Sequence, residues 1–351
     1  MQLADFDYHL PTDLIAQEPV HPRDSARLML INRQTGTISH HHIYDLPALL
    51  RKALQAGLPP FHVVANNTKV FPTRLLGHKS TGGKVEILLT SPLGHSTYRC
   101  ISKPGLKTGD IVLFPLPTGS DLVGHPTRSD PQGYEITLQF DQEESTLRTT
   151  LSQIGTMPTP PYIKKLLGNS SDYQTIYAKY GFSAAAPTAG LHFTPDLLKQ
   201  IKIDHPWHEL TLNVGLGTFL PVKENNLADH HMHAESYTIS PSLAKDISHP
   251  LLAIGTTTMR ALESNPTLTP GHHSTSIFIY PPYKFQQVDA LLTNFHLPGS
   301  TLLILVSSFC SAPNSPEKFT TFKDSLLGRA YASAIQNNYR FFSFGDAMLI
   351  I

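Results

Sequence analysis

The residues with the clearest chemical potential lie in the run AAAPTAGLHFT, residues 184–194. Small side chains surround Thr188 there, and Gly190 can adopt conformations that a side chain forbids, so the backbone can approach a ligand closely. His192 follows, and an unperturbed imidazole titrates near neutral pH. Residues 194–196 (TPD) add an N-cap, a proline in the first helical position and a first-turn acid. This pattern predicts a tight loop that delivers a histidine to the start of a helix; an ordinary loop before a helix is the alternative.

A second candidate site is a helix start that follows an apolar strand. Residues 251–254 (LLAI) predict the strand, Gly255-Thr256-Thr257-Thr258 a turn, and residues 259–263 a helix. Free backbone N–H groups and the helix dipole make such a turn an anion site, for a carboxylate or a phosphate, and Arg260 could assist. A well-capped helix without a ligand is the other interpretation.

Histidines gather in a third segment, His230-His231-Met232-His233-Ala234-Glu235. On a strand, His231, His233 and Glu235 would share one face and resemble a two-histidine, one-carboxylate metal site. Because no second cluster completes such a site, the same residues could equally serve as acid–base groups in a cleft.

Two further segments combine polar groups with turns. Asn294 and His296 interrupt two apolar segments, and residues 340–346 (RFFSFGD) place Asp346 after a glycine among aromatic residues. The chain contains no Walker-type loop, no GxGxxG after a strand, no GxSxG and no CxxC. Nucleotide hydrolysis, dinucleotide redox chemistry and serine hydrolysis therefore lose support.

Two domains are expected to position these residues. The 351 residues can bury a large core. Short β-rich segments separated by Gly and Pro turns fill residues 66–156 and predict an inserted all-β barrel, whereas residues 1–65 and 157–351 alternate helix and strand patterns and predict a larger α/β domain. Within the larger domain we expect a helix at 173–179, a strand at 275–280 and a buried helix at 300–309.

The composition of the chain bears on its cellular compartment and on the kinds of partner it can bind. The formal net charge is +0, so no global basic signal indicates nucleic acid. Charge is distributed unevenly along the inserted domain, however. Between residues 66 and 109 there is a single acid, Glu86, against the bases Lys69, Arg74, Lys79, Lys84, Arg99, Lys103 and Lys107. Two cysteines imply no disulfide framework, the first residues contain acids and no apolar run, and the most apolar segment is too short for a bilayer, so we expect a cytoplasmic protein.

Taken together and in order, the motifs resemble one family, the S-adenosylmethionine:tRNA ribosyltransferase-isomerases of queuosine biosynthesis. The resemblance covers essentially the whole chain. It rests on the segments MPTPPYIKK (157–165), AAAPTAGLHFT (184–194), NVGLGTFLPV (213–222), HHMHAES (230–236), IGTTTMRALES (254–264), YPPYKFQQVDALLTNFHLPGSTLLILVSSF (280–309) and YRFFSFGDAMLI (339–350).

The resemblance implies transfer and isomerisation of the ribosyl moiety of S-adenosylmethionine onto a 7-aminomethyl-7-deazaguanine base in a tRNA anticodon. Epoxyqueuosine-tRNA, adenine and methionine would be the products. S-adenosylmethionine would be a cosubstrate, with no permanently bound cofactor and no metal. The bases of 69–107 and Lys164-Lys165 would steer the anticodon arm, and the protein would be a monomer.

The resemblance also implies roles for particular residues. The proton transfers would fall to His192, His233, Glu235, His296 and Asp346. The cosubstrate would be bound by Thr188, Gly190, Gly215, Gly217, Thr218, Gly255, Thr256, Thr257, Arg260 and Asn294. Asn213 departs from the family pattern, which usually has histidine there, and it receives no catalytic role; Leu216, Leu220, Asn67 and Lys69 depart as well.

Two other functions compete with this interpretation. A metal-dependent hydrolase would use His231, His233 and Glu235, and would contain stoichiometric metal. A non-catalytic RNA-binding protein would use the basic half of the inserted domain, and would bind tRNA without consuming S-adenosylmethionine.

Overall fold

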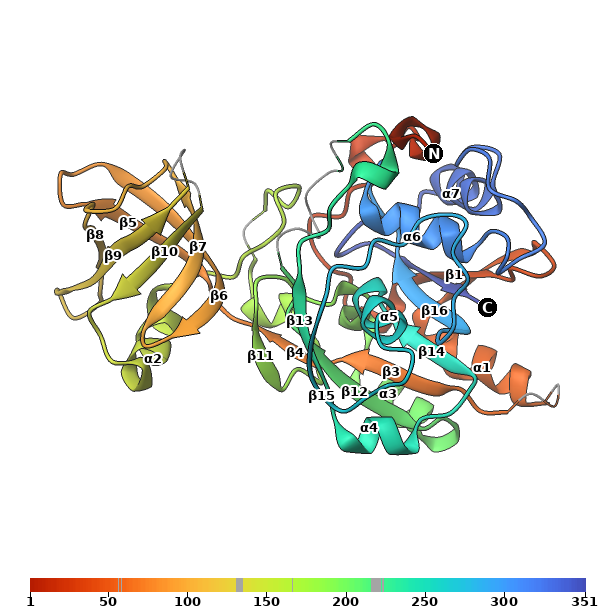
Figure 1. Ribbon diagram of the computed structural model, residues 1–351. Helices are drawn as coiled ribbons and strands as arrows, with labels where there is room; N and C mark the ends of the chain where they lie inside the picture. The colour runs from red at the N-terminus through yellow and green to blue at the C-terminus, as the bar shows by residue number, and fades with distance from the viewer. Residues whose placement is uncertain (56, 58, 131–134, 166, 216–221, 223) are drawn as a thin grey trace. The chain divides into compact units, whose positions relative to one another are not determined.

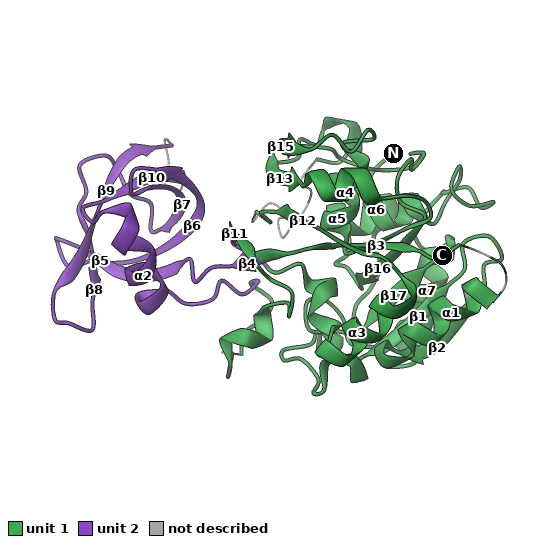
Figure 2. Cartoon of the chain, turned by 90° about the horizontal axis from the view of Figure 1, so that it is seen from below, with its two compact units in different colours: residues 1–68, 161–180, 186–351 green, residues 69–160, 181–185 purple. Residues whose placement is uncertain are grey.

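The computed structural model describes residues 1–55, 57, 59–130, 135–165, 167–215, 222 and 224–351. Their contacts form two compact units (Figure 2). Unit 1 comprises residues 1–68, 161–180 and 186–351, and unit 2 comprises residues 69–160 and 181–185. The sequence places the insertion at 66–156, without the short return segment 181–185.

Unit 2 is a closed antiparallel barrel with the strand order β10-β7-β6-β5-β8-β9. Its strands are β5 (Arg74–Lys79), β6 (Lys84–Gly94), β7 (Thr97–Lys103), β8 (Val112–Pro115), β9 (Asp121–Ser129) and β10 (Glu135–Phe140). Alternate residues such as Val85, Ile87 and Leu89 point into the barrel core, together with Leu147 and Leu151 of helix α2 (Glu144–Ile154). The expected barrel inserted into a mixed α/β protein is confirmed.

Unit 1 contains a nine-stranded mixed sheet with the order β15-β13-β12-β3-β14-β16-β17-β1-β2 (Figure 1). Its strands are β1 (Arg27–Ile31), β2 (Ile38–His42), β3 (His62–Asn66), β12 (Trp207–Leu212), β13 (Glu235–Ile239), β14 (Leu251–Ile254), β15 (Gly271–Thr275), β16 (Ala290–Asn294) and β17 (Ala347–Ile350). β4 (Thr68–Val70) and β11 (Tyr180–Ser183) form a separate two-stranded sheet.

Helices cover both faces of this sheet (Figure 2). They are α1 (Leu46–Gln55), α3 (Pro195–Asp204), α4 (Pro241–Asp246), α5 (Thr256–Glu263), α6 (Thr301–Phe309) and α7 (Leu326–Gln336). α1 and α3 pack on one face, where Leu50 and Ile201 join Val63, Ile254 and Leu292 in the core; α4, α5 and α6 lie on the other. Among the described residues, no helix is both long and apolar enough to cross a membrane.

Strand direction brings distant segments to one edge of the sheet. β12, β3, β14 and β16 are parallel neighbours, so their carboxyl ends lie at the same edge. β17 runs antiparallel to β16, with Asn294 opposite Ala347, so the residues before β17 arrive at that edge as well. Ligands of open α/β sheets bind outside the carboxyl ends of parallel strands, and this edge is therefore the expected place for a site.

Two expected elements are wrong. Residues 173–179 form no α-helix, because the side chain of Arg23 and the backbone of Asn67 take groups that a helix would use: Arg23 Nη1 donates to Gln174 O (2.8 Å), and Lys179 N donates to Asn67 O (2.8 Å). The strand expected at 275–280 ends at Thr275, where its partner β13 begins at Glu235. Helix α6 with its Ser300 N-cap confirms the expected helix at 300–309.

Candidate active site

A pocket opens at the carboxyl edge of the unit 1 sheet. It is lined by residues from the segment after α2, the loop before α3, the starts of α5 and α6, the ends of β12 and β16, and the segment before β17. The lining residues are Tyr162, Ala186, Pro187, Thr188, Ala189, Val214, Gly255, Thr256, Thr257, Thr293, Asn294, Phe295, His296, Leu297, Ser300, Leu302, Phe342 and Ser343. Six residues expected from the sequence lie together here: Thr188, Gly255, Thr256, Thr257, Asn294 and His296.

The start of α5 forms one wall of the pocket. Gly255 has φ +88°, which favours glycine and lets the chain turn from β14 into the helix. The Thr257 side chain has no hydrogen-bond partner among the described residues, although Thr257 is only 6% exposed. A buried hydroxyl without a partner beside a helix N-terminus is available for a ligand that accepts a hydrogen bond.

Asn294 connects three segments at the edge of the pocket. Its Nδ2 donates to Phe342 O (3.1 Å) and contacts His192 Nε2 (3.2 Å), while Thr188 Oγ1 donates to its Oδ1 (3.1 Å). Because a carbonyl only accepts, the amide nitrogen must face Phe342 and His192, so Nε2 of His192 accepts and the imidazole proton sits on Nδ1. His192 itself does not line the pocket; Asn294 stands between them.

His296 lies in the pocket wall and is held from several sides. Its Nε2 is 2.9 Å from Thr293 Oγ1, its amide donates to the Tyr331 hydroxyl (2.8 Å), and its carbonyl accepts from Tyr8 (2.6 Å). Burial lowers the pKa of His296 to about 3, and burial together with the nearby Arg340 and Arg23 lowers that of His192 to about 3. Both imidazoles are therefore neutral at pH 7, which corrects the expectation that His192 titrates near neutrality.

A buried ion pair supports the pocket from behind. Arg260 Nη1 of α5 is 2.5 Å from Glu235 Oε2, and the two side chains are 2% and 5% exposed. The other oxygen of Glu235 accepts from the amide of Gly215 (3.0 Å), close to the pocket residue Val214. Glu235 and Gly215 thus position the chain after β12 instead of facing the pocket. Arg260 Nη2 has no hydrogen-bond partner within the described part of the chain.

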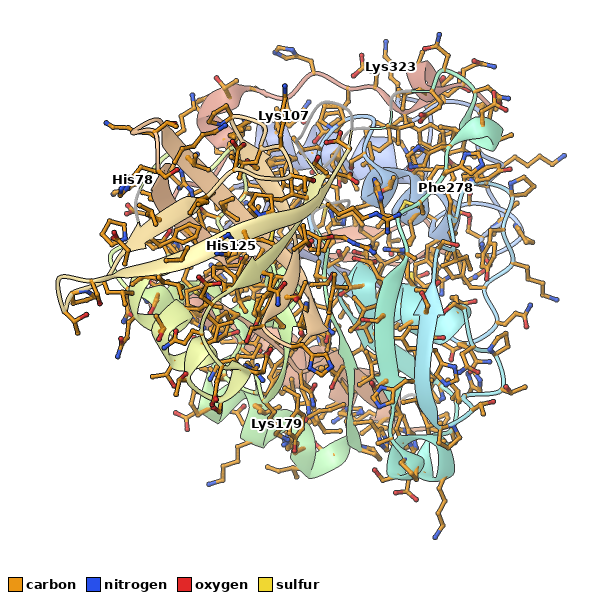
Figure 3. All side chains as sticks on the ribbon, turned by 60° about the vertical axis from the view of Figure 1, so that its left-hand side comes forward. His78, Lys107, His125, Lys179, Phe278 and Lys323 are labelled. Atoms are coloured by element: carbon orange, nitrogen blue, oxygen red, sulfur yellow. The ribbon has the colours of Figure 1, made fainter. Side chains whose placement is uncertain are left out.

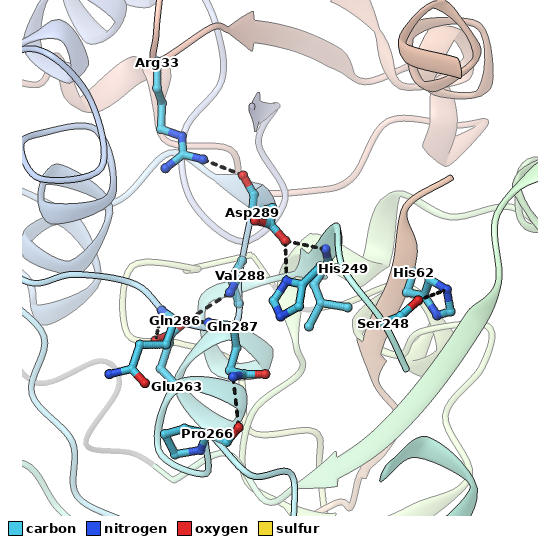
Figure 4. Close-up of polar contacts among 11 residues, drawn as sticks. Arg33, His62, Ser248, His249, Glu263, Pro266, Gln286, Gln287, Val288 and Asp289 are labelled. Carbon is cyan, nitrogen blue, oxygen red and sulfur yellow. Dashed lines mark hydrogen bonds and ion pairs between the residues drawn. The ribbon is translucent and has the colours of Figure 1, made fainter. Parts of the chain in front are cut away.

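The far end of α5 is held by the carboxylate of Glu263. The Glu263 carboxylate accepts the amides of Gln286 (3.0 Å), Gln287 (2.9 Å) and Val288 (3.0 Å) (Figure 4). These contacts fix the orientation of α5, and with it the direction in which the amides of its first turn point.

Other residues expected at the site lie elsewhere. Asp346 is 2% exposed, and its two oxygens accept the amides of Arg27 and Arg340 (2.8 Å each). Gly190 is required by packing, since a Cβ there would lie 2.0 Å from the Tyr177 hydroxyl. Gly217 and Thr218 fall outside the described residues.

The metal interpretation of the histidine cluster depended on a strand that does not extend that far. β13 begins at Glu235, so His231 and His233 precede it in an irregular segment, where both are exposed. Glu235 is buried against Arg260. No group of three metal-ligating side chains is found within the residues that the structure describes. The geometric premise for convergence of these three residues is therefore wrong.

Sequence reasoning missed the three aromatic residues of the pocket, of which Phe295 belongs to the core and Tyr162 and Phe342 lie on loops. Tyr162 stands in the proline-rich segment MPTPPYIKK, and Phe342 stands in YRFFSFGDAMLI, three residues before the Gly345-Asp346 turn. That placement was the available signal, because aromatic residues on loops commonly serve recognition.

The neutral histidines predict a pH dependence of stability. From the ordinary value of 6.5 down to about 3, the unfolded chain binds a proton at His296 that the folded protein does not. The free energy of unfolding should therefore fall as the pH drops through this window, by up to about 1.4 kcal/mol per pH unit for this residue. Urea unfolding followed by fluorescence of the single tryptophan, Trp207 in unit 1, at pH 7, 6 and 5 measures the slope.

His296→Leu should reduce that slope by up to about 1.4 kcal/mol per pH unit, which corresponds to one proton bound by the unfolded chain. His41→Leu is the matched control and should keep the wild-type slope; His41 lies on the edge strand β2, with its Nε2 2.9 Å from Ser39 Oγ. An unchanged slope in His296→Leu would mean that His296 is protonated alike in both states.

Comparison with known proteins gives a consistent result over the whole chain. A family model described as "Queuosine biosynthesis protein" matches residues 3–350. The chain is 44% identical to the S-adenosylmethionine:tRNA ribosyltransferase-isomerase of Symbiobacterium thermophilum, over 100% of both chains. It is 43% identical to the protein of the same name from Fusobacterium nucleatum, over 99% of this chain and 96% of that one. The crystal structure of the S-adenosylmethionine tRNA ribosyltransferase from Thermotoga maritima is similar, with a TM-score of 0.52 and 32% identity over 99% of this chain and 100% of that chain.

Proposed function

The chain belongs to the queuosine biosynthesis protein family, and we infer from this membership that it is an S-adenosylmethionine:tRNA ribosyltransferase-isomerase. It transfers and isomerises the ribosyl moiety of S-adenosylmethionine onto the 7-aminomethyl-7-deazaguanine base at the wobble position of a tRNA anticodon. The products are epoxyqueuosine-tRNA, adenine and methionine. The observation that supports a site for this chemistry is the single pocket wall in which Thr188, Thr257, Asn294 and His296 meet.

The start of α5 is proposed to bind the carboxylate of the methionine part of the cosubstrate. The first-turn amides and the helix dipole favour an anion, and the Thr257 hydroxyl supplies a directed donor. Arg260 adds positive charge from within the same helix, although Nη1 is occupied by Glu235. The other anion considered from the sequence, a tRNA phosphate, is the alternative occupant.

Thr257→Val is expected to weaken binding of S-adenosylmethionine by about 10-fold or more, because a hydrogen bond to a charged group contributes about 1.5–3 kcal/mol. Calorimetric titration measures the dissociation constant. Thr258→Val is the matched control, since the Thr258 hydroxyl donates to Ile254 O at the end of β14 (2.7 Å) and Thr258 does not line the pocket. Equal affinities of the two variants would exclude Thr257 as a ligand.

His296 is proposed to remove the proton from C5′ of the cosubstrate, which the adjacent sulfonium makes acidic. The C5′–H bond breaks and the proton passes to the neutral imidazole of His296. The electron pair of the broken bond stays on C5′, next to the positively charged sulfur. Burial opposes protonation of His296 from water. It does not oppose this transfer to the same degree, because one positive charge moves within the pocket and no new charge is created. The imidazolium can then return the proton to the departing adenine.

The remaining predicted residues are assigned supporting roles. His192, with its tautomer fixed by Asn294, positions the loop that carries Thr188. Asp346 organises the turn before β17, and Glu235 organises the end of β12. His233 is exposed and lies outside the pocket lining, so it receives no role in proton transfer.

The tRNA is proposed to contact basic side chains of unit 2 and of the Lys164-Lys165 segment of unit 1. Two of the expected bases are neutralised by ion pairs, Arg74 with Glu86 (2.8 Å) and Lys79 with Asp110 (3.0 Å), and Lys165 pairs with Glu18 (2.5 Å). The exposed bases left for phosphate contacts are Lys69, Lys84, Arg99, Lys103, Lys107 and Lys164, of which Lys107 is labelled in Figure 3. We also propose that the protein acts in the cytoplasm and as a monomer.

Release of adenine from S-adenosylmethionine tests this function. The reaction is run with chelator present, with tRNA carrying the aminomethyl-deazaguanine base, with unmodified tRNA, and without tRNA. Release that requires the modified tRNA is expected. Release that stops in chelator would favour the metal-dependent alternative, and tRNA binding without adenine release would favour the binding-only alternative.

A further inference from the structure

Phe342 lines the pocket in a backbone conformation that bulky residues rarely adopt. Its φ is +70°, in the left-handed region that favours glycine. Three hydrogen bonds hold it there: its amide donates to Phe295 O (3.2 Å), and its carbonyl accepts from Asn294 Nδ2 (3.1 Å) and from the amide of Gly345 (2.9 Å). Such strain persists where the surroundings enforce it, and it concentrates at ligand clamps.

Tyr162 completes an aromatic corner with Phe342. The ring centroids are 4.9 Å apart and the planes meet at 54°. The Tyr162 hydroxyl lies 2.7 Å from Ser343 Oγ, which keeps its ring in place, and burial raises the pKa of Tyr162 to about 12, so the hydroxyl remains protonated.

The third aromatic residue of the pocket belongs to the core. Phe295 is 0% exposed, and its ring packs against Tyr331 (5.2 Å), Tyr339 (5.6 Å) and Phe341 (4.9 Å). Phe342 is 4% exposed and meets Phe341 edge-on (6.4 Å), but it lines the pocket together with Tyr162, which comes from a segment 180 residues away. Neither residue takes part in the proton transfers or in the proposed carboxylate site.

We propose that Phe342 and Tyr162 form the subsite that stacks the adenine ring of S-adenosylmethionine, an assignment that rests on the proposed function. Adenine is the flat aromatic part of this cosubstrate, and stacking on aromatic side chains is how proteins commonly hold a base. The other polar groups of the pocket suit the ribose hydroxyls and the methionine carboxylate. A sulfonium would instead favour a cage of rings around the charge, and two rings meeting at 54° make a corner.

Calorimetric titration of the full chain with two ligands tests this subsite, with and without tRNA. S-adenosylmethionine and S-adenosylhomocysteine share the adenine, but the latter has no sulfonium. Phe342→Leu keeps an apolar side chain and the backbone cost of positive φ, and removes only the aromatic ring. It is expected to weaken binding of both ligands by about 10-fold.

Phe344→Leu is the matched control, because Phe344 stands two residues away, is 2% exposed and packs on Tyr173 outside the pocket. It should leave both dissociation constants unchanged. Tyr162→Leu, at a half-buried position, should weaken both ligands as Phe342→Leu does, and it replaces that variant if a melting curve shows Phe342→Leu to be unfolded.

Three outcomes would overturn the assignment. Loss of affinity for S-adenosylmethionine alone would place the rings at the sulfonium. Unchanged affinity of both folded variants for both ligands would remove the rings from the site. If the wild-type protein binds neither ligand, the proposed function fails and the subsite with it, whereas wild-type binding with insensitive variants rejects the subsite alone.

Discussion

His296→Ala is expected to lower kcat for adenine release by about 10²–10⁴-fold, the usual contribution of a general acid–base group. His296 is the one imidazole among the sequence candidates that lines the described pocket, and the contacts of Thr293, Tyr331 and Tyr8 hold it in one orientation. Single-turnover adenine release at saturating S-adenosylmethionine and modified tRNA measures the chemical step.

Two further measurements accompany this test. Because the pKa of His296 is lowered to about 3, the pH–rate profiles of the wild type and of His296→Ala should both lack a limb from this residue between pH 5 and 8. His41→Ala, on the edge strand β2, should retain the wild-type rate. A folded His296→Ala protein that turns over within about threefold of wild type would contradict the assignment, since proton-transfer groups typically contribute far more.

Glu235→Ala is expected to lower the free energy of unfolding of unit 1 by about 3–5 kcal/mol, because removing one partner of a buried ion pair leaves an uncompensated charge. Arg260 is 2% exposed and would lose its carboxylate at 2.5 Å, and the amide of Gly215 would lose its acceptor. Urea unfolding followed by Trp207 fluorescence reports on this unit, which contains the single tryptophan of the chain.

The double variant Glu235→Leu with Arg260→Met distinguishes loss of the charge pair from loss of packing. Removing both charges with apolar residues of similar size is often neutral, so the double variant should recover most of the stability lost by Glu235→Ala. A loss below about 1 kcal/mol in Glu235→Ala would show that the pair behaves like an exposed one.

Local patterns in the sequence were reliable guides to single elements. Short β-rich segments between Gly and Pro turns predicted the barrel and strands such as β6, and residues 194–196 predicted the start of α3, where Thr194 Oγ1 accepts from the amide of Leu197 (3.2 Å). These interactions lie within a few residues of one another, so the residue types decide them. Residues 173–179 misled because Arg23 and Asn67, distant in sequence, take backbone groups there.

The arrangement of the site depended on contacts between distant segments as well as on local patterns. The sequence alone determined the family, through motifs in a fixed order, and determined which loops carry Thr188, Thr257, Asn294 and His296. Only the tertiary structure decided which of these residues face one pocket, because that depends on β3, β12, β14 and β16 running parallel and ending at one edge. It also separated His296, which lines the pocket, from the exposed His233, and neutralised the former, because burial and neighbouring charges set a pKa and neither is a property of the residue type.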